Sequence, residues 1–174
     1  MAVEKAKINQ ILRLIAKGGE TGADAVEELY FSMGKIMFSV AHAIVQNTFE
    51  AQDVVQNSFV KIVQNADKFR FFQNGYGWVL TIVRNTALNS LKSGKNRPHA
   101  DVDELSVPAP SSDPDDKIAV RSALAKLDEK ERAVIVMKYY EDKTIRAIAA
   151  ELGMPFSTVQ SVCDRAEKKL KNLL

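Results

Sequence analysis

Residues 144–170 read TIRAIAAELGMPFSTVQSVCDRAEKKL and have the spacing of a helix-turn-helix. Ala149, Gly153 and Val159 stand at the fixed offsets of that motif. A small residue lets the two helices approach, glycine ends the first helix in a tight turn, and a branched apolar residue locks the second helix across it. The stretch therefore predicts two short helices joined at Gly153.

The second helix of this motif has an inner stripe and a polar face. Val159, Cys163, Ala166 and Leu170 recur at helical spacing and form the inner stripe. The other face carries hydroxyl, amide and basic groups, which suit base edges in the major groove and phosphates. The predicted DNA contacts are Ser157, Thr158, Gln160, Ser161, Arg165, Lys168 and Lys169, with Arg146 on the preceding helix. The alternative is an ordinary helical hairpin with a polar face.

Cysteine and histidine are too scarce for a metal site or a nucleophilic centre. Cys163 is the single cysteine, and its place on the inner stripe predicts a small buried residue. A nucleophilic cysteine would want a nearby base, and this part of the chain holds no histidine. His42 and His99 are far apart in sequence, whereas structural zinc needs about four paired ligands. We expect no metal and no cofactor.

A boundary is marked by proline and acidic charge. Residues 94–116 hold four of the five prolines, six acids and no aromatic residue. Low apolar content with proline and serine is typical of an extended, mobile linker. We therefore predict one domain over 1–94, a flexible acidic linker over 95–116, and a second domain over 117–174. Lys and Arg exceed Asp and Glu in both domains, which suggests a polyanionic partner.

Both domains are expected to be helical, because apolar residues recur at helical spacing and no long stretch alternates with period two. In the first domain, two helices meet at Gly18 and Gly19, with Tyr30 on the inner stripe of the second. A third helix begins after the N-cap Thr48, and a fourth covers about 78–92. The second domain is predicted to hold four helices, over about 117–126, 129–140, 144–152 and 156–171. The predicted fold class is all-α, with two small bundles.

An aromatic, basic loop is the second distinctive feature. Residues 68–78, KFRFFQNGYGW, hold five of the 13 aromatic residues, and the longer stretch 68–98 carries six basic residues and no acid. Rings can stack on unpaired bases while cations hold the backbone, so the loop is suited to single-stranded nucleic acid. The alternative is that the rings close the core, as we expect for Phe69 and Trp78.

Composition excludes several classes of protein. Apolar residues make up 46% and charged residues 26%, as in an ordinary globular chain. The longest uncharged stretch has 14 residues, which is short of the roughly 18 that a membrane span needs. The first ten residues lack the apolar run of a signal peptide, so a cytoplasmic protein is expected. No phosphate-cradling glycine loop or nucleophile–base set is present, which argues against an enzyme.

Three segments resemble bacterial RNA polymerase sigma factors of the extracytoplasmic-function (ECF) class. The polymerase-binding helix of that family is similar to TFEAQDVVQNSFVKIVQNADKF, residues 48–69. Its promoter-melting helix is similar to WVLTIVRNTALNSLKS, residues 78–93. Its C-terminal domain resembles LAKLDEKERAVIVMKYYEDKTIRAIAAELGMPFSTVQ, residues 124–160. The resemblance keeps this order from about residue 11 to 174.

The resemblance implies a non-enzymatic initiation factor that binds core RNA polymerase and promoter DNA, both duplex and single strand, without membrane insertion. It implies that Asp53, Gln56 and Asn57 dock on a coiled coil of the polymerase, and that the loop 68–78 captures a flipped base. The residues implied for the proximal promoter element are Lys68, Arg70, Phe71, Phe72, Asn74, Tyr76, Arg84, Asn85, Asn89 and Lys92. The resemblance leaves open an anti-sigma protein as a further partner.

The chain departs from the family in the second helix of the helix-turn-helix. Relatives commonly have basic residues where this chain has Gln160 and Val162. An amide can bond an adenine edge, and a branched apolar group can contact a thymine methyl, so these roles are expected for Gln160 and Val162. Arg165, Lys168 and Lys169 would then hold the phosphates.

A stand-alone helix-turn-helix regulator that binds operator DNA without polymerase is the alternative function. Such a protein usually needs a dimer to contact two half-sites. The chain offers no long apolar heptad pattern for a dimer, so the sequence favours the sigma factor.

Overall fold

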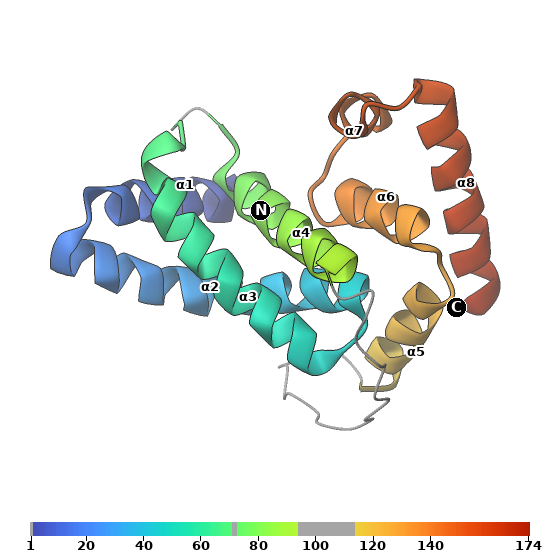
Figure 1. Cartoon of the computed structure of the whole chain (residues 1–174), viewed down its shortest axis with the longest axis horizontal. Coiled ribbons are helices and arrows are strands. Elements are labelled where there is room, and N and C mark those ends of the chain that lie inside the picture. The colour runs from blue at the N-terminus through green and yellow to red at the C-terminus, as the bar shows by residue number, and fades with distance from the viewer. Residues whose placement is uncertain (1, 71–72, 94–113) are drawn as a thin grey trace. The chain divides into compact units, whose positions relative to one another are not determined.

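The computed structural model describes residues 2–70, 73–93 and 114–174, so predictions for Phe71, Phe72 and most of the linker lie outside the described residues. The described residues form helices and no strand, and the all-α prediction is confirmed. The chain divides into two compact units, Met1–Gly94 and Lys95–Leu174 (Figure 1), each of which is described by itself. No helix in the described ranges is long and apolar enough to cross a membrane.

The described residues of the N-terminal unit form a bundle of four helices. These are α1 (Ala2–Lys17), α2 (Gly19–Val45), α3 (Thr48–Asn65) and α4 (Gly75–Ser93), with the 3-10 turn η1 (Ala66–Lys68) after α3. Helices α1, α3 and α4 all pack on α2, and α3 also packs on α4 (Figure 1). Fully buried side chains from all four helices fill the centre, among them Leu12, Met37, Ile62 and Leu80.

The boundaries between these helices follow from backbone geometry. Gly18 and Gly19 have φ of 69° and 65°, a region open to glycine, and they separate α1 from α2 as predicted. Asn47 rather than Thr48 is the N-cap of α3, because its backbone is extended and its side chain accepts a hydrogen bond from the Glu50 N–H at 3.0 Å. Both residues are good caps, so sequence alone did not separate them.

The C-terminal unit contains α5 (Pro114–Ala125), α6 (Glu129–Tyr139), α7 (Ile145–Leu152) and α8 (Phe156–Leu173). Helix α8 packs on the other three (Figure 1). Helix α5 begins at Pro114, ahead of residue 117 where the sequence placed the domain start. Proline suits the first helical position because its φ is fixed near the helical value.

The predicted helix-turn-helix is present in α7 and α8. Gly153 has φ of 63°, and the Met154 N–H donates to the Ala149 carbonyl oxygen at 3.0 Å, which closes the end of α7. Val159 is fully buried and Ala149 nearly so, in one cluster with Ile148. The three offset residues therefore have the roles that their spacing predicted.

Candidate functional sites

One side of α3 is exposed and carries both apolar and polar residues. Phe49, Asp53, Gln56, Val60 and Val63 follow one another at intervals of four and three residues, so they form one row along the helix. All five are exposed, with 55% of Phe49 and 54% of Val60 open to solvent, while the buried residues of α3 lie on its opposite side. This spacing is that of a helix that packs along a coiled coil. We call this row the α3 face.

The α3 face extends onto α2 through aromatic rings. Tyr30 is 57% exposed, so its predicted place on the inner stripe is wrong. Its ring lies 5.9 Å from that of Phe59 on α3 and 5.8 Å from that of Phe31, which is 73% exposed. Tyr30 follows the fully buried Leu29 by one position, which turns it about 100° away from the core.

Asp53, Gln56 and Asn57 are all exposed on α3, off its buried side. The sequence did not single out the apolar members of the α3 face. The signal in the sequence is the spacing of positions 49, 53, 56, 60 and 63, which are separated by four and three residues in turn. Because two of these positions are polar, the pattern is not a wholly apolar heptad repeat.

The loop before α4 is held by Asn9 of α1. Its Oδ1 accepts a hydrogen bond from the Gly75 N–H at 2.8 Å, and its Nδ2 donates to the Gln73 carbonyl oxygen at 3.0 Å. A Cβ atom on Gly75 would lie 2.5 Å from this Oδ1, so the close approach of loop and helix requires glycine. Asn9 therefore positions the loop that is predicted to meet DNA, although no pattern in the sequence pointed to it.

The described rings of the loop face inward in part. Phe69 is 8% exposed and lies against the half-buried Trp78, with ring centroids 5.5 Å apart, so the prediction of a core ring is confirmed for Phe69 and holds in part for Trp78. Tyr76 is half-buried at the start of α4. Asn74, predicted as a DNA contact, accepts a hydrogen bond from the Gly77 N–H at 3.3 Å, and its carbonyl accepts from the Trp78 N–H. It therefore caps α4, which begins at Gly75 rather than at about Trp78.

Helix α4 presents part of the predicted DNA-binding set to solvent. Asn85, Asn89 and Lys92 are exposed at intervals of four and three residues and form one row. Lys68 and Arg70, at the end of η1 and in the loop, are exposed as well. These five residues offer amide and cationic groups for a strand or a groove.

Arg84 does not belong to this surface. Only 2% of it is exposed, and its Nη2 donates to Asn85 Oδ1 at 3.2 Å. The prediction of a DNA contact for Arg84 is therefore wrong, because its side chain is held within the bundle. A basic residue in an acid-free stretch looks exposed in sequence, and only packing shows otherwise.

In the C-terminal unit, several of the predicted DNA-binding residues of α8 are exposed. Ser157, Thr158, Ser161 and Lys168 are exposed, and so is Arg146 on α7. Val162 is an exception, since it is 8% exposed and belongs to the core cluster with Val159 and Cys163. The expected contact between Val162 and a thymine methyl is therefore wrong. Gln160 is half-buried, and its Nε2 donates to Asp164 Oδ1 at 2.7 Å.

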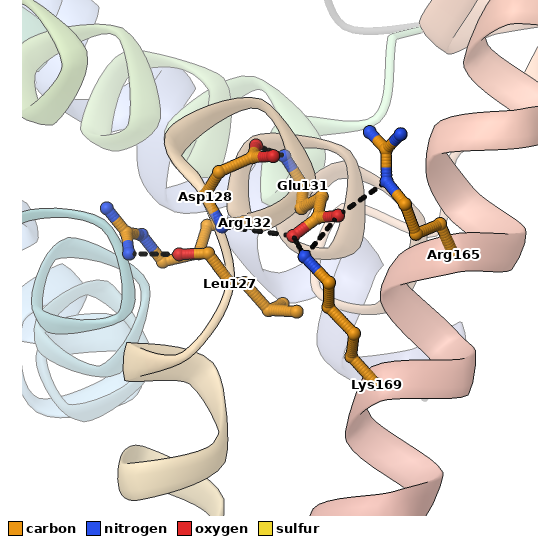
Figure 2. Close-up of polar contacts among 6 residues, drawn as sticks. All are labelled: Leu127, Asp128, Glu131, Arg132, Arg165 and Lys169. Carbon is orange, nitrogen blue, oxygen red and sulfur yellow. Dashed lines mark hydrogen bonds and ion pairs between the residues drawn. The ribbon is translucent and has the colours of Figure 1, made fainter.

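Two of the predicted phosphate contacts on α8 are paired with a buried carboxylate on α6. Figure 2 shows Arg165 and Lys169 converging on Glu131, whose side chain is fully buried. Arg165 Nε donates to one carboxylate oxygen at 2.7 Å, and Lys169 Nζ donates to both at 2.8 Å. Both cations keep partly open side chains, 56% and 42% exposed, but they are directed toward α6. Lys168, which is also exposed, is the member of the predicted phosphate set on α8 that does not pair with Glu131.

Glu131 also closes the N-terminus of α6. Its carboxylate accepts from the Asp128 N–H at 3.0 Å, and Asp128 accepts from the Glu131 N–H at 2.8 Å, which is a capping box (Figure 2). Burial by itself would raise the pKa of Glu131, but hydrogen bonds from Lys169, the Asp128 backbone and Arg165 lower it to about 2. The spacing of Asp128 and Glu131, an acid followed three residues later by a glutamate, is the sequence signal for this cap.

The lowered pKa predicts acid sensitivity of the C-terminal unit. A folded-state pKa of about 2 against an ordinary 4.5 means that the charged Glu131 stabilises the fold above about pH 4.5. This stabilisation is lost as the pH falls toward 2. The protection of the α6 and α8 amides against hydrogen exchange, relative to their intrinsic exchange rates at each pH, should therefore fall over that interval in the full chain, and Glu131→Gln should flatten the response. Glu129→Gln, an exposed acid in the same turn, is the matched control and should leave it unchanged. An equal pH response in wild type and Glu131→Gln would contradict this assignment.

Cys163 is confirmed as a core residue. It is fully buried within the cluster of α6, α7 and α8. Burial, together with its hydrogen bond to Glu167, raises the pKa of the thiol to about 11. The thiol is thus protonated at neutral pH, which suits a packing role rather than a nucleophile.

Two family models match this chain. "Sigma-70 region 2" covers residues 29–97 and "Sigma-70, region 4" covers residues 117–170. Together they account for more than two thirds of the 174 residues. The chain therefore belongs to the sigma-70 family, a family of non-enzymatic transcription factors. Region 2 covers most of the N-terminal unit, and region 4 covers most of the C-terminal unit.

Curated relatives place the chain in the ECF class. "ECF RNA polymerase sigma factor SigM" of Mycobacterium tuberculosis (strain ATCC 25618 / H37Rv) is 27% identical over 151 residues, with 86% of this chain and 77% of that protein covered. "ECF RNA polymerase sigma factor SigW" of Bacillus subtilis (strain 168) is 21% identical over 183 residues, with 96% of each covered. The resemblance found in the sequence is thereby confirmed.

Solved structures share the fold. CnrH, in complex with the cytosolic domain of CnrY, is 22% identical with a TM-score of 0.62, and the match covers 95% of both chains. The sigma factor RpoE, in complex with the anti-sigma factor NepR from Bartonella quintana, is 22% identical with a TM-score of 0.66. That match covers 84% of this chain and 94% of RpoE.

Proposed function

We propose that this chain is a dissociable transcription initiation factor that binds core RNA polymerase and directs it to recognise and open specific promoters. The observation that carries this proposal is the exposed α3 face within sigma-70 region 2. A stand-alone operator-binding regulator needs no such row of exposed apolar side chains beside Asp53 and Gln56, so that alternative is not favoured.

The N-terminal unit would act on the proximal promoter element. The exposed amides and cations of α4 and its preceding loop suit a strand and its phosphates, and the loop's aromatic residues suit unpaired bases. Asn9 and Gly75 would keep this loop in place by their hydrogen bond. Phe71 and Phe72, which lie outside the described residues, remain candidates for the stacking role.

The C-terminal unit would bind the distal element through α8 in the major groove. Neither unit carries a large positive charge, and residues 95–116 are strongly acidic, so the free chain should bind DNA weakly. Tethering both units on polymerase would raise their effective concentration at the promoter. The residues 95–116 would serve as the linker between them.

We assign no catalytic reaction to the chain, and we place its action in the cytoplasm with RNA polymerase. An anti-sigma protein is a second partner to consider, because RpoE is described in complex with the anti-sigma factor NepR. Such a partner would compete with polymerase if it covered the α3 face.

Asp53→Lys should weaken binding to core polymerase about three- to tenfold, since a reversed charge at the edge of an interface mainly lowers association. Its folding stability should change by no more than about 0.5 kcal/mol, because the residue is exposed. Fluorescence anisotropy with labelled protein and core polymerase measures the first, and urea unfolding measures the second. Asp24→Lys makes the same charge change at an exposed site on α2 and should bind normally. Normal binding by Asp53→Lys would remove Asp53 from the docking surface.

A further inference from the structure

An exposed aromatic side chain stands at the first residue of α8. Phe156 follows the N-cap Pro155, and 52% of it is exposed. The next apolar residues of α8, Val159, Val162 and Cys163, are all buried in the core cluster. Phe156 is thus the large apolar residue that the start of this helix leaves open to solvent.

The other exposed residues on the first two turns of α8 are polar. Ser157, Thr158 and Ser161 are exposed on the first two turns of α8, and each has a short hydroxyl side chain. Gln160 lies one turn after Phe156 on the same side of the helix and is tied to Asp164. A single exposed aromatic residue is ordinary on a protein surface, so exposure alone carries little weight. The position of Phe156 at the start of the second helix of the helix-turn-helix is what points to a role in DNA binding.

The second helix of a helix-turn-helix lies in the major groove, and its N-terminal residues contact base edges. Hydrogen-bond donors and acceptors cover most of that groove, and the C5-methyl of thymine is the apolar group that it presents. A phenyl ring cannot satisfy a donor or an acceptor, but it can exclude water from a methyl group. An exposed phenylalanine that met the major groove at this place would therefore discriminate between base pairs by the methyl group.

We propose that Phe156 contacts the C5-methyl group of a thymine in the distal promoter element and thereby favours thymine over cytosine at that base pair. The inference rests on the proposed function, because it needs α8 to lie on promoter DNA. It replaces the methyl contact expected of Val162, whose side chain is buried. Phe156 would be a residue that determines specificity, and Gln160, one turn further along the same side of α8, would supply a polar contact.

Deoxyuridine provides an atom-level test, because it removes the methyl group and leaves base pairing intact. On a promoter mapped with the reconstituted holoenzyme, each thymine of the distal element is replaced in turn, and transcript yield is measured at limiting holoenzyme. With wild type, the transcript yield should fall about three- to fivefold when one particular thymine is replaced, as expected for the loss of one buried methyl group. Phe156→Ala should give a lower transcript yield on the unmodified promoter, and deoxyuridine at that position should not lower its yield further. Phe156→Leu keeps an apolar side chain and should keep part of the sensitivity.

A second set of templates carries the methyl group on cytosine instead of thymine. Where the thymine is changed to cytosine, 5-methylcytosine should recover part of the lost yield with wild type and none with Phe156→Ala. If no thymine shows methyl dependence with wild type, or if Phe156→Ala retains it, the inference is overturned while promoter-specific transcription still supports the proposed function. If no template gives promoter-specific transcripts, both are overturned together.

Discussion

Val60→Asp should weaken binding to core polymerase by at least about thirtyfold, because the loss of a hot-spot residue at the centre of an interface costs about 2 kcal/mol or more. Val60 is 54% exposed and stands between Gln56 and Val63 in the α3 face, where docking would remove it from water. An aspartate there would lose its hydration without gaining a partner. The free protein should stay folded, since the position is open to solvent.

The matched control is Val120→Asp, which makes the same substitution at an exposed valine of α5 in the C-terminal unit. Titration of labelled protein with core polymerase at two salt concentrations separates the apolar loss from a simple charge effect. Val60→Asp should stay weak at both concentrations. If it binds as wild type does, the α3 face is not the docking surface.

Gly75→Ala should reduce open-complex formation more than tenfold, with a smaller loss in closed-complex binding. The added Cβ would meet Asn9 Oδ1 at 2.5 Å, Leu12 Cδ1 at 3.0 Å and Phe69 Cζ at 3.2 Å, so the loop must shift away from α1. Overpacking of this kind costs about 1–3 kcal/mol in stability. Permanganate reactivity of unpaired thymines measures opening, and mobility shift of the holoenzyme complex at low temperature measures closed binding.

Two further variants separate a displaced loop from an unfolded protein. Asn9→Ala removes both hydrogen bonds to the loop without a clash, and it should impair opening in the same direction. Gly34→Ala is the glycine control, since its Cβ would make only ordinary contact with Tyr30 at 3.5 Å, and alanine stabilises a helix interior by about 0.5–1 kcal/mol. Normal opening by Asn9→Ala would show that the loop needs no anchor on α1.

The helices and their turns were predictable because short-range sequence patterns determine them. Apolar spacing fixed the buried stripes of most helices, paired glycines fixed the break at Gly18, and the offsets of Ala149, Gly153 and Val159 fixed the turn between α7 and α8. Each of these signals lies within a few residues of the structure that it determines. The errors at Thr48 and Trp78 concern helix ends: Asn47 and Thr48 are both good caps, and α4 begins at Gly75, three residues before Trp78.

The sites were predictable only in part, because several of their residues depend on partners far along the chain. Asn9 reaches a loop 64 and 66 residues away, and Lys169 reaches Glu131 across 38 residues. No local pattern specifies such contacts. The predictions of DNA contacts for Arg84 and Val162 were wrong for a related reason. Each lies at the margin of the apolar stripe of its helix, where burial depends on the neighbouring helix that packs over it.

The central claim is that promoter recognition by this chain depends on RNA polymerase, and run-off transcription on genomic DNA tests it most directly. Core polymerase, the chain, and both together are compared for transcripts with defined start sites. We predict new, promoter-specific transcripts only when both are present, together with weak, salt-sensitive DNA binding by the chain alone. Tight, sequence-specific binding by a dimer of the isolated chain, with no new start sites on adding it to core polymerase, would contradict the account.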